Sequence, residues 1–306
     1  MTNPTPPPAR RALGSSGLTV PPLAYGCWRF AGSSVDEARA RIETAIGAGL
    51  DLIDTADIYG FGGAGFGAAE ELLGAVLRAD PGLRDAMVLA TKGGIRPPVP
   101  YDSSAPSLRA AIDASRRRLG VDVIDLWQVH RPDVLTHPAE VAETLVWAVT
   151  SGAVRTVGVS NYTPPQYEAL RVHLAGTPVR LVSTQPEVHA LALAAVDDGV
   201  LDLAVRDDLV PLAWSPLAGG RLGDGVVAAD AREAAVHAAL DDIAAREATT
   251  RSTVALAWIM FHPSRPVPIV GSNRPDRIRA AADALRVPLD RTDWYAVARA
   301  AGRPQP

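Results

Sequence analysis

The stretch Met87-Val88-Leu89-Ala90-Thr91 is a short run of apolar and β-branched residues, and Lys92 follows it directly. A run of this kind predicts a buried β-strand. The segments before and after it, 68–78 and 107–119, carry apolar residues at three- and four-residue spacing, which predicts a helix on each side. A strand between two helices is the repeating unit of an α/β protein with parallel strands.

The same unit recurs along the chain. Helical spacing is also present at 35–49 and 139–151. Short apolar runs predict eight strands, at 22–27, 50–54, 87–91, 124–129, 156–159, 180–184, 210–214 and 267–270. Eight strands and their helices over roughly 250 residues are what a (β/α)₈ barrel requires. We therefore expect an α/β fold, a (β/α)₈ TIM barrel.

Two features fall outside the regular repeat. The segment Ala12–Val20 predicts an N-terminal β-hairpin before the first barrel strand. Two helical stretches, 229–247 and 251–261, lie between the seventh and eighth strands, so one of them is an extra helix. We expect residues 1–11 to be a disordered Pro-rich tail and residues 12–306 to form a single domain, because no linker divides the rest of the chain.

The composition narrows the class of function. The 306 residues are 47% hydrophobic and 21% charged, which is typical of a globular protein, and the net charge of −4 argues against nucleic acid or an anionic membrane as the main partner. The start of the sequence lacks the apolar core of a signal peptide, and no run approaches the roughly 18 apolar residues of a membrane span. A single cysteine, Cys27, suits a reducing compartment. We expect a cytoplasmic protein.

Lys92 is the only lysine, and the other 29 of the 30 basic residues are arginine. Its compact ammonium has a pKa that responds to the surroundings, whereas a guanidinium is planar and always charged. Lys92 also falls at the C-terminal end of a predicted strand, where TIM barrels carry their functional groups. This position favours a functional lysine over the alternative of a leftover surface residue.

Reactive side chains fall at other strand ends as well. Asp54 ends the second strand, Tyr59 follows it by five residues, and His130 ends the fourth. An ammonium lowers the pKa of a nearby phenol from its usual value of about 10, and a carboxylate would hold that ammonium in place. Such a group could protonate the alkoxide that forms when a hydride reduces a carbonyl, with His130 orienting the oxygen. The hydride must come from a cofactor.

These residues fall within seven short sequence motifs. They are IDTADIYG (53–60), ATK (90–92), DLWQVHRP (125–132), GVSNY (158–162), QPE (185–187), AWSPL (213–217) and PIVGS (268–272). In this order, from about residue 12 to residue 285, the chain resembles the aldo-keto reductases. The run 277–281 and the later Trp294 are most similar to a bacterial subgroup of uncharacterised oxidoreductases.

The resemblance implies a catalytic tetrad. Tyr59 would be the general acid, Lys92 and Asp54 its tuning pair, and His130 the residue that orients the carbonyl. The implied activity is that of an NADPH-dependent oxidoreductase that reduces an aldehyde or ketone to an alcohol by hydride transfer. The implied partner is a small carbonyl substrate. We expect a monomer, and an oligomer stays open.

The resemblance also implies contacts to NADPH or NADP⁺. The nicotinamide carboxamide would bond to Ser160, Asn161 and Gln185, and its ring would stack on Trp214. The pyrophosphate would lie along 217–222, which includes Leu217, Gly219, Gly220 and Arg221. The 2′-phosphate would meet Ser272, Asn273 and Arg277, which would favour NADPH over NADH. The remaining implied contacts are Gly26, Cys27, Trp28, Asp54, Ser215 and Gly271.

Some features leave alternatives open. Many relatives place Glu and Asn three and four residues after the phosphate-binding arginine, but this chain has Ala280 and Ala281, so the adenine contacts are uncertain. Gly60–Gly65 satisfies GxGxxG, but it begins six residues after Asp54, which does not fit the tight turn of a Rossmann fold. Some proteins similar to this family are regulatory subunits of ion channels, so a redox-sensing role is an alternative. The histidines show no metal-ligand spacing, and we expect no metal.

Overall fold

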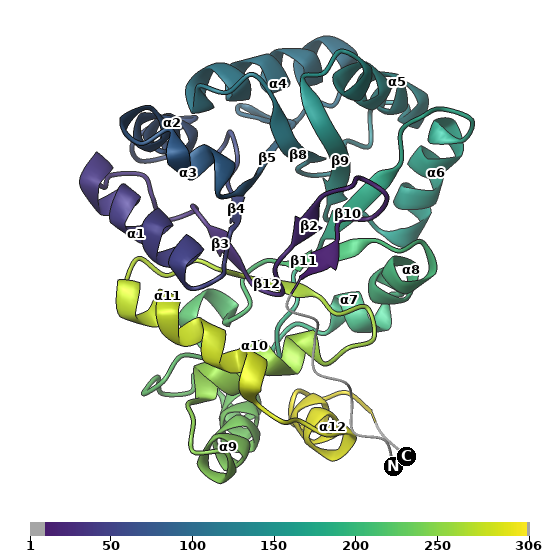
Figure 1. Ribbon diagram of the computed structural model, residues 1–306. Helices are drawn as coiled ribbons and strands as arrows, with labels where there is room; N and C mark the ends of the chain where they lie inside the picture. Colours follow the sequence, from purple (N-terminus) through teal and green to yellow (C-terminus); the bar gives the residue numbers. More distant parts are fainter. Residues whose placement is uncertain (1–9, 305–306) are drawn as a thin grey trace.

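The computed structural model describes residues 10–304, and a closed barrel of eight parallel strands forms its centre (Figure 1). In chain order the barrel strands are β3 (Ala24–Gly26), β4 (Leu52–Asp54), β5 (Val88–Gly93), β8 (Ile124–Val129), β9 (Val154–Ser160), β10 (Leu181–Gln185), β11 (Val210–Ala213) and β12 (Val267–Val270). Strand β12 pairs with β3 and closes the ring. The prediction of an α/β fold with a (β/α)₈ TIM barrel is confirmed.

Helices cover the outside of the barrel (Figure 1). Those between successive barrel strands are α1 (Val35–Gly47), α2 (Ala68–Ala79), α3 (Gly82–Asp85), α4 (Ala105–Leu119), α5 (Pro138–Thr150), α6 (Pro164–Leu174), α7 (Ala194–Asp197), α8 (Val200–Arg206), α9 (Ala231–Arg246) and α10 (Arg251–Met260). After β12 come α11 (Pro275–Ala281), the 3₁₀ turn η2 (Ala282–Arg286) and α12 (Arg291–Ala300). Helices α9 and α10 both lie between β11 and β12, which confirms the extra helix. Within residues 10–304 no helix is long and apolar enough to cross a membrane.

A hairpin of β1 (Arg11–Ala12) and β2 (Thr19–Val20) precedes the barrel, as the sequence predicts, and it lies across one barrel opening (Figure 1). Leu13 and Val20 are fully buried and join the cluster of strand side chains that fills the barrel interior. At Gly14, where φ is +51°, a Cβ would lie 3.0 Å from Val182 of β10, so glycine allows this close approach. The hairpin therefore closes the N-terminal end of the barrel, and the C-terminal end carries the site.

The predicted tail, residues 1–11, needs a correction at its end. Residues 1–9 lie outside the described part of the chain. Arg11, however, belongs to β1, and its guanidinium donates to the carbonyl oxygens of Ser264 and Arg265 at 2.9 and 2.6 Å. The composition of the tail could not predict that Arg11 is ordered, because a Pro- and Arg-rich sequence does not indicate which distant carbonyl oxygens its arginines bond. The assignment of the remaining chain to a single domain stays a prediction.

Strand β5 extends further than its apolar pattern indicates. It runs to Gly93, so Lys92 lies inside the strand and pairs with Gln128 of β8. An apolar pattern ends at the first charged residue, but a strand tolerates that residue when a buried carboxylate pairs with it. A small hairpin of β6 (Ile95–Arg96) and β7 (Val99–Tyr101), which the sequence did not indicate, follows β5.

Local signals set several helix boundaries. Ser34 and Glu37 form a capping box at the start of α1, in which each side chain accepts a bond from the other residue's backbone N–H. Thr163 and Gln166 do the same at the start of α6. Helix α4 ends at Gly120, whose left-handed conformation closes the last turn. The starts of α1 and α6 follow the loops after β3 and β9, at the end of the barrel that carries the site, whereas Gly120 precedes β8 at the opposite end.

Helices α2 and α4 approach each other closely at Gly74. A Cβ on Gly74 would lie 2.0 Å from the carbonyl oxygen of Arg118, which is backbone and cannot move alone. Buried Glu70, one turn earlier on α2, pairs with the Arg118 guanidinium at 2.6 Å. The small residue therefore lets the two helices come together and form this ion pair.

We expect Gly74→Ala to destabilise the protein by about 1 to 3 kcal/mol, because the added methyl must push the helices apart. Gly47→Ala is the matched control: Gly47 lies at the exposed end of α1, and its Cβ would meet no atom within 4 Å. That change should be neutral or stabilise by up to about 1 kcal/mol, through helix propensity. Urea denaturation of both variants measures the difference, and equal stability of the two would contradict the close packing at Gly74.

Candidate active site

The C-terminal ends of neighbouring strands bring four of the predicted residues together. Asp54 is the last residue of β4, Lys92 lies near the end of β5, and His130 directly follows β8. Tyr59 lies on the loop after β4, and its ring contacts the ring of His130 at a centroid distance of 6.0 Å. The four residues that sequence reasoning assigned to the tetrad thus lie side by side.

Lys92 and Asp54 form a buried ion pair. The ammonium donates to both carboxylate oxygens of Asp54, at 2.9 and 2.7 Å, and to the carbonyl oxygen of Thr55 at 2.8 Å. Lys92 is fully buried and Asp54 is 2% exposed. The side chain of Gln185 donates to Asp54 Oδ1 at 2.9 Å, so the carboxylate is held from two strands.

The surroundings keep Lys92 charged. Burial by itself would lower its pKa, but Asp54 and then Tyr59 raise it, and the net shift lies above the ordinary value. The ammonium lies 5.0 Å from the centroid of the Tyr59 ring. A permanent positive charge is therefore held beside the phenol.

The pKa of Tyr59 departs from the expectation of a lowered value. Burial raises this pKa above its ordinary value, Lys92 acts in the opposite direction, and Asp54 adds to the rise. The net direction is upward, because the phenol is buried, which a linear pattern does not show. Lys92 still lowers the pKa relative to an equally buried phenol without an ammonium. Tyr59 is consequently protonated at neutral pH and available as a proton donor.

His130 is neutral at this site. Burial lowers its pKa well below the ordinary value, and the positive charges of Lys92 and Arg131 lower it further. Its Nδ1 is buried and has no hydrogen-bond partner among the described residues. A neutral imidazole can donate one hydrogen bond to a carbonyl oxygen without carrying a charge.

A second group of predicted residues joins the tetrad through hydrogen bonds. Asn161 donates to the carbonyl oxygen of His130 at 3.2 Å and to Ser160 Oγ at 2.8 Å, and it accepts from Trp214 Nε1 at 2.9 Å. Ser160 Oγ in turn donates to the backbone carbonyl of Gln185 at 2.9 Å. The residues expected to meet a nicotinamide therefore form one network across β9, β10 and β11.

The loop after β11 has an unusual backbone. Ser215 and Ala218 have positive φ values of 52° and 51°, and Gly219 and Gly220 in the 3₁₀ turn η1 (Ala218–Gly220) have 69° and 110°. Such conformations cost of order 1–3 kcal/mol for residues other than glycine and cluster at functional sites. A Cβ on either glycine would meet no atom within 4 Å, so the outer side of this turn is open.

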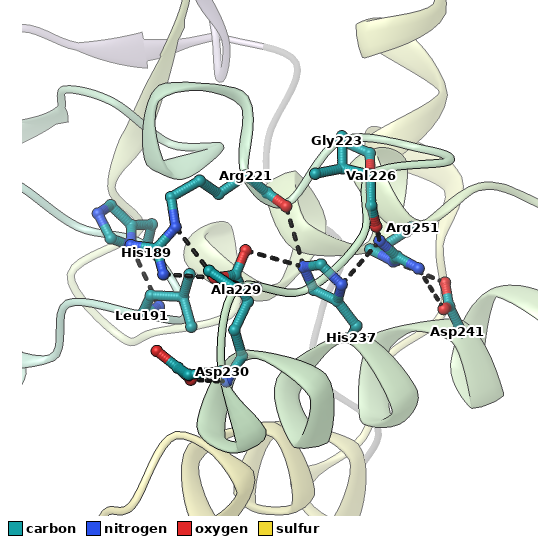
Figure 2. Close-up of polar contacts among 11 residues, drawn as sticks. His189, Leu191, Arg221, Gly223, Val226, Ala229, Asp230, His237, Asp241 and Arg251 are labelled. Atoms are coloured by element: carbon teal, nitrogen blue, oxygen red, sulfur yellow. Dashed lines mark hydrogen bonds and ion pairs between the residues drawn. The ribbon is translucent and has the colours of Figure 1, made fainter.

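Buried polar groups anchor the end of this loop to α9 and α10 (Figure 2). Arg221 forms an ion pair with Glu233, so the guanidinium that was expected at a pyrophosphate is held by a carboxylate. The ring of His237 bonds through Nε2 to the carbonyl oxygen of Arg221 at 2.9 Å and through Nδ1 to Arg251 at 3.0 Å. Arg251 also donates to the carbonyl oxygens of Gly223 and Val226, at 3.2 and 3.1 Å.

The predicted residues after β12 lie at the surface beside this loop. Gly271, Ser272 and Asn273 are half-buried, and Arg277 is exposed on α11 and forms no ion pair among residues 10–304. The carbonyl oxygen of Ser272 accepts a bond from Tyr25 at 3.1 Å. Arg277 therefore has a free cationic group at the position where the 2′-phosphate was expected.

The predicted residues after β3 divide into buried and exposed ones. Gly26 and Cys27 are fully buried, so the thiol of Cys27 packs in the core. Trp28 is 61% exposed, and its ring meets the ring of Tyr59 edge to face at 4.8 Å. Trp28 thus lies at the surface of the site, directly beside the phenol.

Two supporting features were not anticipated from the sequence. Arg29 donates to the carbonyl oxygens of Gly271 and Gly219, at 2.8 and 3.4 Å. Glu70 accepts a bond from Thr91, the residue before Lys92, at 2.5 Å. One arginine among 29, or one glutamate on an amphipathic helix, has no distinguishing pattern in a sequence, so only alignment with relatives could have indicated them.

Comparison with known proteins places this arrangement in a family. The aldo/keto reductase family model matches residues 22–301. The 6-dehydroglucose reductase of Novosphingobium aromaticivorans is 52% identical over 298 residues, which are 96% of this chain and 96% of that protein. The uncharacterised oxidoreductase YcsN of Bacillus subtilis is 36% identical over 287 residues, 90% of this chain and 92% of that protein.

A solved structure has the same fold. The crystal structure of the thermostable aldo-keto reductase Tm1743 matches with a TM-score of 0.79 and covers 95% of this chain and 99% of its own, at 22% sequence identity. The family match over residues 22–301 and the 52% identity to a reductase over nearly the whole chain show that this protein is an oxidoreductase of the aldo/keto reductase family.

Proposed function

We propose that the protein reduces an aldehyde to a primary alcohol with NADPH, and that Tyr59 is the proton donor. The observation that carries the proposal is the buried Lys92–Asp54 pair beside a protonated phenol, with a neutral His130 next to it. Burial keeps Tyr59 protonated, and the ammonium stabilises the phenolate that remains after proton transfer. This combination suits carbonyl reduction, in which negative charge develops on the oxygen.

The residues around the site fit a nicotinamide dinucleotide phosphate. Trp214 offers a flat face that is partly exposed, and the open outer side of the turn at Gly219 and Gly220 leaves room for a pyrophosphate. Arg277 supplies a cation that has no carboxylate partner within residues 10–304. Bound NADPH would supply the hydride. At the adenine end Ala280 is exposed and Ala281 is buried, so neither offers a polar contact.

The protein side chains then have separate tasks. His130 donates a hydrogen bond to the carbonyl oxygen and orients it toward Tyr59. Tyr59 transfers its proton to that oxygen as charge develops. Lys92 and Asp54 act through Tyr59, so they are positioning residues. Ser160, Asn161 and Gln185, at the strand ends, would hold the nicotinamide amide.

The substrate we propose is a sugar aldehyde of the 6-dehydroglucose type. The relative of that name is 52% identical across nearly the full length of both chains. Trp28 supports this choice, because its exposed ring beside Tyr59 is a flat surface on which the C–H face of a pyranose can pack.

The alternative function is that of a redox-sensing subunit that binds NADPH without turnover. Many turnovers per protein molecule with 6-dehydroglucose, and few with simple aromatic aldehydes, would support the enzyme and its substrate together.

Tyr59→Phe tests the proton donor. We expect the reduction rate to fall by roughly 10² to 10⁴, because the phenol supplies the proton in the transition state. NADPH binding, followed by quenching of tryptophan fluorescence, should stay intact. Tyr295→Phe is the control: Tyr295 lies on α12 and is partly exposed, away from the barrel strand ends, so its loss should leave the rate unchanged. Near-normal turnover in Tyr59→Phe would move the acid role to another group.

Lys92→Met and Lys92→Arg separate charge from shape. The Met variant removes the charge and leaves Asp54 buried without its partner. The Arg variant keeps the charge but places a wide planar group in a space that holds a compact one. We expect both to fold, as circular dichroism would report, and both to lose nearly all activity. Substantial activity in a folded Lys92→Arg protein would show that charge alone suffices.

Arg277→Ala tests the choice of cofactor. A guanidinium that bonds the 2′-phosphate contributes only to NADPH binding, since NADH lacks that group. We expect NADPH affinity to fall about tenfold and NADH affinity to change little. Arg279→Ala, two residues later on the same helix and also exposed, is the matched control. An equal loss of affinity for both cofactors would argue against a 2′-phosphate contact.

A further inference from the structure

Asp57 is a buried carboxyl group that pairs with no cation within residues 10–304. It lies on the loop between Asp54 and Tyr59 and is 1% exposed. Asp54, three residues earlier, is met by the Lys92 ammonium, whereas Asp57 Oδ1 is buried and has no hydrogen-bond partner among the described residues. A carboxylate buried without such partners is costly, so a group in this position tends to keep its proton.

The Asp57 side chain is packed beside the strand that carries Lys92. A Cβ on Gly93, the next residue of β5, would lie 3.0 Å from Asp57 Oδ2. The same Cβ would lie 3.0 Å from the ring of Trp127 and 3.1 Å from the methyl group of Ala111 on α4. The carboxyl group therefore lies against the backbone of β5, in the layer between the barrel and α4.

A second buried carboxylate acts on Asp57 from α2. Glu70 is fully buried, and Arg118 of α4 bonds it through Nε and Nη2 at 2.7 and 2.6 Å. Burial raises the pKa of Asp57 well above its ordinary value, and the negative charge of Glu70 raises it further. Arg118, the backbone N–H of Ile58 and Arg96 of β6 oppose this rise only in part. The fold therefore favours the uncharged form of Asp57.

The loop that carries Asp57 is bonded along β5. The N–H of Thr55 donates to the carbonyl oxygen of Ala90 at 2.9 Å, and the N–H of Asp57 donates to that of Lys92 at 3.0 Å. In the other direction, the Lys92 ammonium donates to the carbonyl oxygen of Thr55 at 2.8 Å. Tyr59 follows Asp57 by two residues, so the position of Asp57 sets where the phenol lies relative to the ammonium.

We propose that Asp57 is a positioning residue, which as an uncharged acid holds the loop of Tyr59 against β5. Ionisation would place a second negative charge beside Glu70 in the buried layer, and the loop would have to open to hydrate it. The phenol would then move away from Lys92. The effect on catalysis rests on the proposed function, whereas the charge state of Asp57 does not.

Urea denaturation at several pH values tests the charge state. A carboxyl group whose pKa is raised on folding stabilises the protein below its unfolded pKa of about 3.9, and this contribution is lost as the pH rises through the folded pKa. Asp57→Asn keeps the shape without a titrating group, so all other groups cancel in the comparison. Between about pH 5 and the folded pKa, the unfolding equilibrium constant of the wild-type protein should rise about tenfold per pH unit relative to that of Asp57→Asn.

Two further variants sharpen this comparison. In Glu70→Gln the like charge is absent, so Asp57 should ionise at a lower pH. Asp57→Asn introduced into that protein should then give a ratio of unfolding constants that levels off at a lower pH. Asp122→Asn, at an exposed position before β8, is the matched control and should leave the wild-type pH dependence of unfolding in place.

The rate of aldehyde reduction tests the positioning role. At neutral pH, kcat should fall about tenfold in Asp57→Ala and stay within about twofold of wild type in Asp57→Asn, because the amide keeps the shape and the neutrality of the acid. The KM for NADPH should not change in either variant. Above the pH at which the ratio of unfolding constants levels off, kcat of Asp57→Asn should rise relative to that of the wild-type protein.

Each result has a defined meaning. A ratio of unfolding constants that does not change with pH would overturn the uncharged acid. Wild-type kcat in Asp57→Ala would overturn the positioning role, and if that variant does not fold, a constant kcat ratio of Asp57→Asn to wild type at alkaline pH would do so. If the wild-type protein reduces no aldehyde, the proposed function itself fails, and the denaturation series still decides the charge state of Asp57.

Discussion

The buried ion pair of Lys92 and Asp54 is the interaction on which the rest of the site depends. A charge removed from water is stable only when an opposite charge and hydrogen bonds replace the lost solvation. Here the ammonium meets both carboxylate oxygens of Asp54 and the carbonyl oxygen of Thr55. That geometry needs β4 and β5 to be neighbours in a particular register, in which Asp54 lies opposite Ala90. Barrel closure supplies this register, and the pair in turn fixes where the phenol of Tyr59 meets a positive charge.

Rigid groups behind the pair hold it in place. Thr91 bonds to buried Glu70, and Glu70 pairs with Arg118 of α4, so the end of β5 is tied to two outer helices. At the opposite end of the barrel, Leu13 of the hairpin fills the interior. The two ends therefore have different tasks: one completes the core, and the other presents polar side chains. This division agrees with the general placement of function in TIM barrels.

The expected cofactor face combines fixed strands with anchored loops. Asn161 links His130 to Trp214, so the strand ends of β8, β9 and β11 share one hydrogen-bond network. The loop after β11 contains left-handed residues that are unfavourable by themselves, and the bonds from His237 and Arg251 hold its far end (Figure 2). A loop that is ordered before binding costs less ordering entropy when a ligand arrives.

The sequence by itself determined the barrel, the hairpin, the extra helix and the candidate tetrad, because periodicity and strand-end position are local properties that survive in a linear pattern. Tertiary structure decided what depends on distant neighbours. The pKa of Tyr59 lies above its ordinary value because the fold buries the phenol, and the thiol of Cys27 is packed in the core. Arg11 pairs with Val20 in the hairpin, and its guanidinium donates to carbonyl oxygens some 250 residues away along the chain. Arg29 donates to the carbonyl oxygens of Gly219 and Gly271, and these contacts could not be read from the sequence, because the energy of a hydrogen bond depends on distance in space and not on separation in sequence.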